Sequence, residues 1–261
     1  MLDDYTSKRP SSPPSPGGSS GEADGGVSEG GGGGTDLPGT GDATVYANGS
    51  SVLYELSPDL STIQSAVHLI GCIDQVLDIA VSAHGSVFAT TAFEFYQIEP
   101  TSGTCTLLNI EGSQNSLTFL PRDASGRELL VGYSDSAYSR IDPKTGKSEW
   151  IGLLDDGYFS SGDIAVMPSG RVYLTVTGNG CGDCLAEIDP ATGKMIQLVG
   201  ALGVSDVYGL AAVGDALYGF SFAGSIMRID TQTAATQIVP LANWTPDVSF
   251  FGAASPPTIH K

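Results

Sequence analysis

The chain has 261 residues, of which 35 are glycine, and a formal net charge of -18 from 29 acidic and 11 basic residues. It has no G-X-Y period and no apolar run near the roughly 18 residues of a membrane-spanning helix, which excludes a collagen and a transmembrane segment. The acidic balance excludes a nucleic-acid-binding surface of the usual basic kind.

The first 42 residues differ in composition from the rest. Between Gly17 and Gly41, 12 of 25 residues are glycine, and such a segment buries too little apolar surface to offset the entropy lost on ordering. We predict a disordered acidic tail or tether at 1–42, a folded domain at 43–256 and a frayed C-terminus at 257–261. Residues 1–10 lack the apolar segment of a signal peptide, so either the protein is cytosolic or a leader was removed, and the flexible tail, which suits a tethered domain, favours the second alternative.

Strands are predicted at 44–47, 52–56 and 64–70, and a repeat then organises the chain. A three-residue motif recurs five times at steps of 42, 43, 47 and 41 residues. Its first residue is apolar, its second is usually acidic and its third is usually proline. The copies are 56–58, 98–100, 141–143, 188–190 and 229–231. The best copies continue as PTSGTCTLL, PKTGKSEWI and PATGKMIQL. Each predicts two strands joined by a Pro-initiated turn with glycine at a position of positive φ.

Short strands rich in small residues alternate with this motif, at 79–81, 117–119, 164–166, 210–212 and 252–254. Further strands are predicted between them, for example at 86–90 and 171–175. Four strands in about 43 residues are typical of a β-propeller blade. The last segment, 248–254, matches the first strand that the opening unit lacks. We therefore predict an all-β, five-bladed propeller of four-stranded blades, in which the first blade combines 43–70 with 248–254 and closes the ring.

The repeats FYQIEPTSG, YSRIDPKTG and LAEIDPATG make residues 44–256 resemble bacterial extracytoplasmic β-propellers of the NHL, quinoprotein and strictosidine-synthase-like type. The resemblance implies a fold and a location in the cell envelope or outside the cell, without specifying an activity. Blade one departs from the pattern at Ser57, and blade five departs from it at Thr231.

The two faces of such a ring carry different connections. Those after strands one and three are tight hairpins that leave little room for a ligand. Those after strands two and four are longer, at 71–75, 153–161, 178–183, 203–206 and 242–247. Loops on a rigid scaffold commonly bind ligands. The ligand-binding candidates on this loop face are Asp155, Asp156, Tyr158, Phe159, Asp206, Tyr208, Trp244 and Asp247. In the alternative, these acids bond local backbone and the aromatics pack under loops.

Asp78 and Asp163 precede inner strands of two blades and are expected at the mouth of the channel. With Asp74 they are candidate oxygen ligands for Ca²⁺, although no EF-hand motif is present. Cys72, Cys105, Cys181 and Cys184 form an even set that permits two disulfides, one of them within blade four and one beside blade two. Free buried thiols are the alternative, and a closed zinc site lacks its further ligands.

The three histidines have no predicted nucleophile or acid beside them, so no catalytic residue is assigned. The leading hypothesis is a monomeric, non-catalytic binding or scaffold propeller, secreted or in the cell envelope, with a protein, peptide or carbohydrate ligand on the loop face. The alternative is a Ca²⁺-dependent propeller hydrolase or lactonase with its site at the channel mouth.

Overall fold

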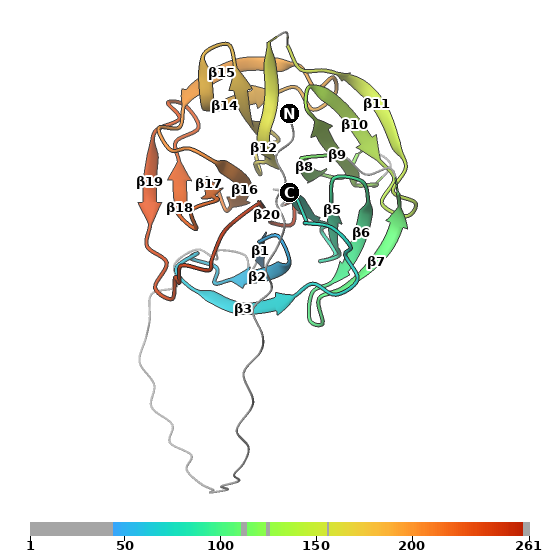
Figure 1. Cartoon of the computed structure of the whole chain (residues 1–261). Helices are drawn as coiled ribbons and strands as arrows, with labels where there is room; N and C mark the ends of the chain where they lie inside the picture. The colour runs from blue at the N-terminus through green and yellow to red at the C-terminus, as the bar shows by residue number, and fades with distance from the viewer. Residues whose placement is uncertain (1–43, 111–113, 124–125, 156, 258–261) are drawn as a thin grey trace, which may run out of the picture. The chain divides into compact units, whose positions relative to one another are not determined.

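The computed structural model describes residues 44–110, 114–123, 126–155 and 157–257. These residues form twenty strands and, within those ranges, no helix, and hence no helix that could cross a membrane. The strands pair as five separate four-stranded antiparallel sheets around a central axis (Figure 1). The predicted five-bladed propeller is confirmed. The tail predicted at 1–42, candidate Asp156 and residues 258–261 lie outside the described residues.

Each sheet is one blade, and its strands follow one another from the axis outward. Blade one is β20 (Gly252–Ala254), β1 (Val45–Asn48), β2 (Val52–Leu56) and β3 (Ile63–His68). Blade two is β4 (Asp78–Val81), β5 (Val87–Thr90), β6 (Phe95–Glu99) and β7 (Thr104–Asn109). Blade three is β8 (Ser116–Leu120), β9 (Leu129–Ser134), β10 (Ala137–Ile141) and β11 (Ser148–Leu153).

Blade four is β12 (Tyr158–Val166), β13 (Val172–Gly178), β14 (Cys181–Ile188) and β15 (Met195–Ala201). Blade five is β16 (Val207–Val213), β17 (Ala216–Ser221), β18 (Ile226–Ile229) and β19 (Thr236–Val239). Strand β20 pairs with β1 through Ala253 and Ala47. The C-terminal strand thus completes the first blade, as predicted, and removes the free edge of β1.

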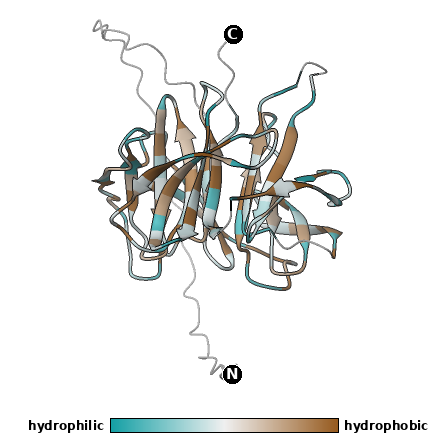
Figure 2. Cartoon of the chain, turned by 90° about the horizontal axis from the view of Figure 1, so that it is seen from above, coloured by the Kyte–Doolittle hydropathy of each residue, from teal (hydrophilic) through white to brown (hydrophobic). Residues whose placement is uncertain are grey.

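Apolar side chains form five clusters rather than one central core. Each cluster lies between two neighbouring blades, for example blades three and four or blades one and five. In Figure 2 hydrophobic residues follow the strands inside the ring, and hydrophilic residues gather at the connections. Burial of these side chains against the next blade is what stabilises the ring.

The recurrent Asp-Pro turn is held by its own side chains. The Asp142 carboxylate accepts hydrogen bonds from the Lys144 amide at 2.9 Å and from the Thr145 hydroxyl at 3.0 Å. The hydrogen bond from the Lys144 amide is the main reason that the pKa of Asp142 lies below its ordinary value, and the bond from the Thr145 hydroxyl lowers it further. Asp189 makes the same pair of bonds at 2.9 and 2.8 Å. The motif therefore specifies a turn.

The same turn also joins blades. In blade four the carbonyl of Gly193 accepts the Tyr133 hydroxyl at 2.6 Å, and the Pro190 carbonyl accepts the Tyr138 hydroxyl at 3.0 Å. Both tyrosines belong to blade three. In blade three the Gly146 carbonyl accepts the side-chain amide of Asn109, from blade two, at 3.0 Å. Each of these turns thus contacts the blade that precedes it in the chain.

Blade four differs from the sequence prediction at two loops. The loop predicted at 178–183 is mostly strand, because Asn179 and Gly180 have φ of 47° and 83° and form a two-residue hairpin turn. Asn-Gly is the preferred pair for such a turn because both positions require positive φ. The loop predicted at 153–161 is likewise shortened, since β12 begins at Tyr158. The extra length makes blade four the longest blade.

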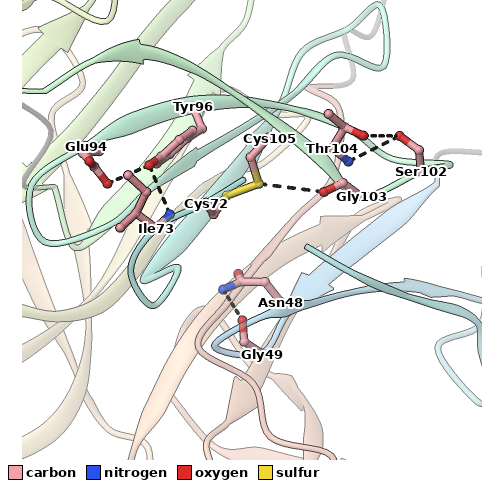
Figure 3. Close-up of a disulfide and its surroundings, with 10 residues drawn as sticks. All are labelled: Asn48, Gly49, Cys72, Ile73, Glu94, Tyr96, Ser102, Gly103, Thr104 and Cys105. Carbon is pink, nitrogen blue, oxygen red and sulfur yellow. Dashed lines mark hydrogen bonds between the residues drawn. A yellow bond between two sulfur atoms is a disulfide. The ribbon is translucent and has the colours of Figure 1, made fainter. Parts of the chain in front are cut away.

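Both predicted disulfides are formed, Cys72–Cys105 and Cys181–Cys184, so free thiols and a zinc site on these residues are excluded. Figure 3 shows Cys72, on the segment between blades one and two, joined to Cys105 of β7. Beside them Ile70 pairs in parallel with Thr104. The bond therefore fastens the connection from blade one to the outer edge of blade two. Two disulfides are consistent with an oxidising environment.

Replacing both Cys72 and Cys105 with alanine is expected to lower the free energy of unfolding by about 3 kcal/mol, because the closed loop of 33 residues is released in the unfolded chain. The matched change at Cys181 and Cys184 opens a loop whose ends are only 3 residues apart in the sequence. We expect it to lower the free energy of unfolding by less than about 2 kcal/mol. Urea denaturation of both variants measures this difference. Equal losses would contradict the interpretation.

Candidate functional site

A cavity of about 300 Å³ lies at one mouth of the central channel. All five blades contribute to it, four through residues at or next to the start of the inner strand and blade four through residues at the irregular part of β12. The lining residues are Gln75, Leu77, Asn115, Ser161, Gly162, Tyr208 and Phe251. This is the face of the longer connections, where the sequence predicted a site.

Two irregularities in strand pairing shape this mouth. The register of β12 against β13 shifts between Ser160 and Ile164, and that of β16 against β17 shifts between Val207 and Gly209. The β12 bulge leaves the Asp163 amide outside the ladder, where it bonds the Thr175 hydroxyl at 2.9 Å. Bulges change the direction of side chains and are common beside binding sites. Here they set the positions of Asp163 and Tyr208.

Directly after the lining residues Leu77 and Gly162 in the chain stand Asp78 and Asp163, which are both fully buried and whose carboxyl groups interact with each other. Asp78 Oδ2 accepts the Leu117 amide of blade three at 2.6 Å. Asp163 Oδ2 accepts the Leu210 amide of blade five at 2.7 Å and the Ala253 amide of blade one at 3.3 Å. The pair therefore ties the inner strands of all five blades together.

The two carboxyl groups share the channel with glycines. The corresponding position on the five inner strands is occupied by Asp78, Ser116, Asp163, Gly209 and Gly252, each directly before the apolar residue that pairs next with the second strand. A Cβ on Gly252 would collide with Asp78 Oδ1 and lie 2.7 Å from Asn48 Oδ1, and a Cβ on Gly209 would lie 2.8 Å from the Ala253 nitrogen. The glycines thus leave the volume that the aspartates fill.

Burial makes both carboxyl groups of the pair easier to protonate than exposed ones. Burial raises the pKa of Asp78 well above its ordinary value, and the nearby Asp163 carboxylate raises it further. Burial also raises the pKa of Asp163, but the amides of Leu210 and Ile164 and the bond from Asp78 oppose that shift. Since Asp163 accepts more hydrogen bonds, its ionised form is favoured. We assign the proton to Asp78, which donates it to Asp163.

The third predicted metal ligand, Asp74, is exposed on the connection before β4. No group of three or more His, Cys, Asp or Glu side chains that could hold a metal occurs in the described ranges. Asp78 Oδ2 and both Asp163 oxygens face backbone N–H donors, whose positive ends favour a carboxylate and oppose a cation. Backbone donors therefore engage three of the pair's four oxygens, whereas the buried Asp78 Oδ1 accepts no hydrogen bond in the described part of the chain.

On the rim of the cavity, Tyr208 is joined to two acids. Its hydroxyl donates to Asp206 at 2.9 Å, and the Asp206 amide donates to Asp183 at 2.8 Å. Burial raises the pKa of Asp183 and the Asp206 amide opposes this shift, while burial and the bond to Asp206 raise the pKa of Tyr208. These contacts hold the phenol and two carboxylates together at one side of the mouth.

An aromatic arc continues from Tyr208. The Tyr208 and Phe222 ring centroids are 6.3 Å apart, and those of Phe222 and Phe251 are 5.3 Å apart at a T-shaped angle. Phe222 remains 47% exposed. The mouth thus combines π faces with negative charge, which is the composition of sites that bind organic cations.

The other predicted ligand-binding residues lie away from this cavity lining. Asp155 Oδ2 accepts the Met195 amide at 2.8 Å and so joins blades three and four. Tyr158 packs against the cluster between these blades, whereas Phe159 is 46% exposed. Trp244 lies against Gly224. Asp247 is exposed; burial raises the pKa of Tyr54, and the Asp247 carboxylate raises it further.

Sequence reasoning missed Asn115, Phe251 and Phe222. Asn115 Oδ1 is buried at the mouth without a hydrogen-bond partner, and the side-chain amide of Asn115 donates to the Ser160 carbonyl at 3.0 Å. Asn115 and Phe251 each lie one residue before the residue of their own blade that corresponds to Asp78, namely Ser116 in blade three and Gly252 in blade one. Aligning the inner strands on Asp78 and Asp163 would have found both.

The comparisons with known proteins add little to this geometry. No protein-family model matches the sequence, and no curated protein matches it. Among solved structures, the crystal structure of a protein of unknown function from Bacteroides caccae aligns with a TM-score of 0.47 and 12% identity, covering 83% of this chain and 100% of that chain. The fold assignment rests on the strand pairing described above: the protein is a five-bladed β-propeller.

Proposed function

We propose that this chain is a non-catalytic binding propeller that takes a positively charged group at the mouth of its channel. The observation that carries the proposal is Tyr208, whose ring lines the cavity while its hydroxyl is held by Asp206. Asp78 and Asp163, next in the chain to the lining residues Leu77 and Gly162, are fully buried, which supports a pocket that binds a group rather than a passage through the ring.

The size and charge of the mouth define the ligand class. A volume of about 300 Å³ admits a single side chain or a small amine. Asp183 and Asp206 supply negative charge, and Tyr208, Phe222 and Phe251 supply π faces. The proposed ligand is an ammonium or guanidinium group carried by a peptide or protein. The two disulfides and the tether predicted at 1–42 support an extracytoplasmic location, secreted or in the cell envelope.

A pair of isosteric probes tests the proposal. We expect n-butylammonium to shift the NMR signals of Tyr208, Asn115 and Phe251, and neutral n-butanol to shift them far less. Asp206→Asn should weaken butylammonium binding about fivefold, since a cation–π and charge contact contributes about 1 kcal/mol. Asp247→Asn, on the same face but outside the cavity lining, is the matched control. Equal binding of the two probes, or equal weakening by the two variants, would overturn it.

The same samples test the Ca²⁺-dependent hydrolase, in which Asp78, Asp163 and Asp74 would hold the ion. A ligand that binds the native state raises its melting temperature. Because the carboxyl pair already bonds the backbone of three other blades, we expect neither Ca²⁺ nor EDTA to change the melting temperature. A rise with Ca²⁺ that EDTA reverses would favour the hydrolase.

A further inference from the structure

The opposite face of the ring carries a concentration of positive charge. Of the 11 Lys and Arg residues in this acidic chain, five line a single cavity of about 660 Å³ on the hairpin side of blade three. They are Arg122, Arg127, Arg140, Lys144 and Lys147. The sequence predicted tight hairpins with little room for a ligand on this face, but the connection between β8 and β9 spans eight residues, 121–128, and the cavity lies beside it.

The cavity has an apolar base and charged walls. The half-buried Leu129 and Pro143 line it together with the buried Leu130 and Ile141. One wall is the Asp-Pro hairpin from Asp142 to Lys147, and another is Arg122 with the end of the β8–β9 connection. His84 of blade two completes the lining. The cavity therefore spans the boundary between blades two and three.

The acids of the cavity do not neutralise its bases. Three acids, Glu128, Asp142 and Glu149, face five cations. Asp142 is engaged by its own turn, and Glu128 accepts the Ala83 amide at 3.1 Å. Three ion pairs with exposed guanidinium groups join Arg122 to Glu128 at 3.9 Å, Arg127 to Asp123 at 3.6 Å and Arg140 to Glu149 at 3.9 Å, and such pairs contribute little.

One guanidinium is fixed across the blade boundary. Arg122 Nη2 donates to His84 Nε2 at 2.7 Å, so the ring nitrogen that carries the proton is Nδ1. The ammonium groups of Lys144 and Lys147 form no ion pair within 4 Å in the described part of the chain. The site thus offers one guanidinium group in a fixed orientation, that of Arg122, and the ammonium groups of Lys144 and Lys147 around an apolar base.

We propose that this cavity binds an organic polyanion, a carbon skeleton carrying two or more carboxylate, sulfate or phosphate groups. Arg and Lys side chains recognise such groups by charge-assisted hydrogen bonds, which are about twice as strong as neutral ones. The apolar base accommodates the carbon skeleton between them. The ligand is opposite in charge to the one proposed for the channel mouth and binds on the other face of the ring, so the two proposals fail independently.

Isothermal titration calorimetry with galacturonic acid trimer and with fructose 1,6-bisphosphate tests this site, and maltotriose and fructose are the neutral controls. The two anions distinguish carboxylate from phosphate recognition. We expect at least one anion to bind, more weakly as salt is raised, and neither neutral sugar to bind. Arg140→Gln with Lys147→Gln should weaken binding at least tenfold, because two charge-assisted contacts are lost.

The matched control is Lys194→Gln with Arg228→Gln. Lys194 follows the Asp-Pro turn of blade four as Lys147 follows that of blade three, and Arg228 lies outside the cavity. This variant has the same net charge as the test variant, and we expect wild-type affinity. Equal weakening in both variants, which indicates general charge attraction only, or no binding of either anion to the wild-type chain, would overturn the proposal. Unchanged melting temperatures show that both variants fold.

Discussion

Replacing Asp163 with asparagine is expected to lower the free energy of unfolding by about 4 kcal/mol, whereas the same change at Asp78 should cost about 1 kcal/mol or less. Asp163 accepts the Ile164, Leu210 and Ala253 amides as well as the Asp78 proton. An asparagine there has one acceptor oxygen, so its NH₂ group faces buried N–H donors that lose their partner.

At Asp78 the substitution is nearly isosteric with the protonated acid. The asparagine oxygen still accepts the Leu117 amide, and the NH₂ group replaces the hydroxyl that donates to Asp163. Urea denaturation of Asp78→Asn and Asp163→Asn compares two changes of identical chemistry, both at fully buried positions. If the two losses are equal, or if Asp78→Asn is the more damaging, the proton is not on Asp78.

The pair also makes stability depend on pH in a defined direction. Because burial raises the pKa of Asp78 in the folded state, the folded protein binds more protons than the unfolded chain above about pH 4, and stability falls as pH rises toward the raised pKa. The slope is at most about 1.4 kcal/mol per pH unit. The stability of the wild type relative to Asp78→Asn should therefore fall as the pH rises above about 4, since the variant lacks this titration.

The second large effect is expected at Gly193, in the Asp-Pro turn of blade four. Its φ is +71°, and a Cβ there would overlap the Tyr138 ring of blade three, 2.5 Å from Cδ1. Gly193→Ala combines the cost of a left-handed residue with overpacking of a buried blade contact, about 4 kcal/mol in all.

Gly170→Ala is the matched control. Gly170 has φ of +83°, but nothing lies within 4 Å of a Cβ at that position, so only the backbone cost of about 1 kcal/mol applies. Chemical denaturation of both variants separates the two contributions. A loss at Gly193 no larger than the loss at Gly170 would show that blade four does not depend on the turn for its contact with blade three.

The parts of the fold that could be predicted are those that neighbouring residues determine. The turn at Asp142 forms bonds only two and three residues along the chain, so its chemistry is visible in each repeat. The pairing of β20 with β1 could be predicted because the opening unit lacked an inner strand. The even cysteine set likewise agreed with the two disulfides.

The candidate site was harder to predict because five distant segments build it. Tyr208 and Asp206 were among the predicted residues, but Asn115 and Phe251 join them only through the ring. The bulges at Ser160 and Val207 shift the inner strands by amounts that no sequence pattern indicates. The basic cavity was missed for a related reason, since His84 and Arg122 come from different blades.

The pairing of β20 with β1 has a consequence for synthesis. Of the twenty strands, β20 leaves the ribosome last, yet it is the inner strand of the blade that emerges first. Until Ala253 and its neighbours emerge, the nascent chain carries an open edge on β1, and Asp163 lacks one of its backbone donors. Blades two to five can form in order of translation, but the first-made blade is the last to be completed, so the ring locks only when translation of the propeller ends.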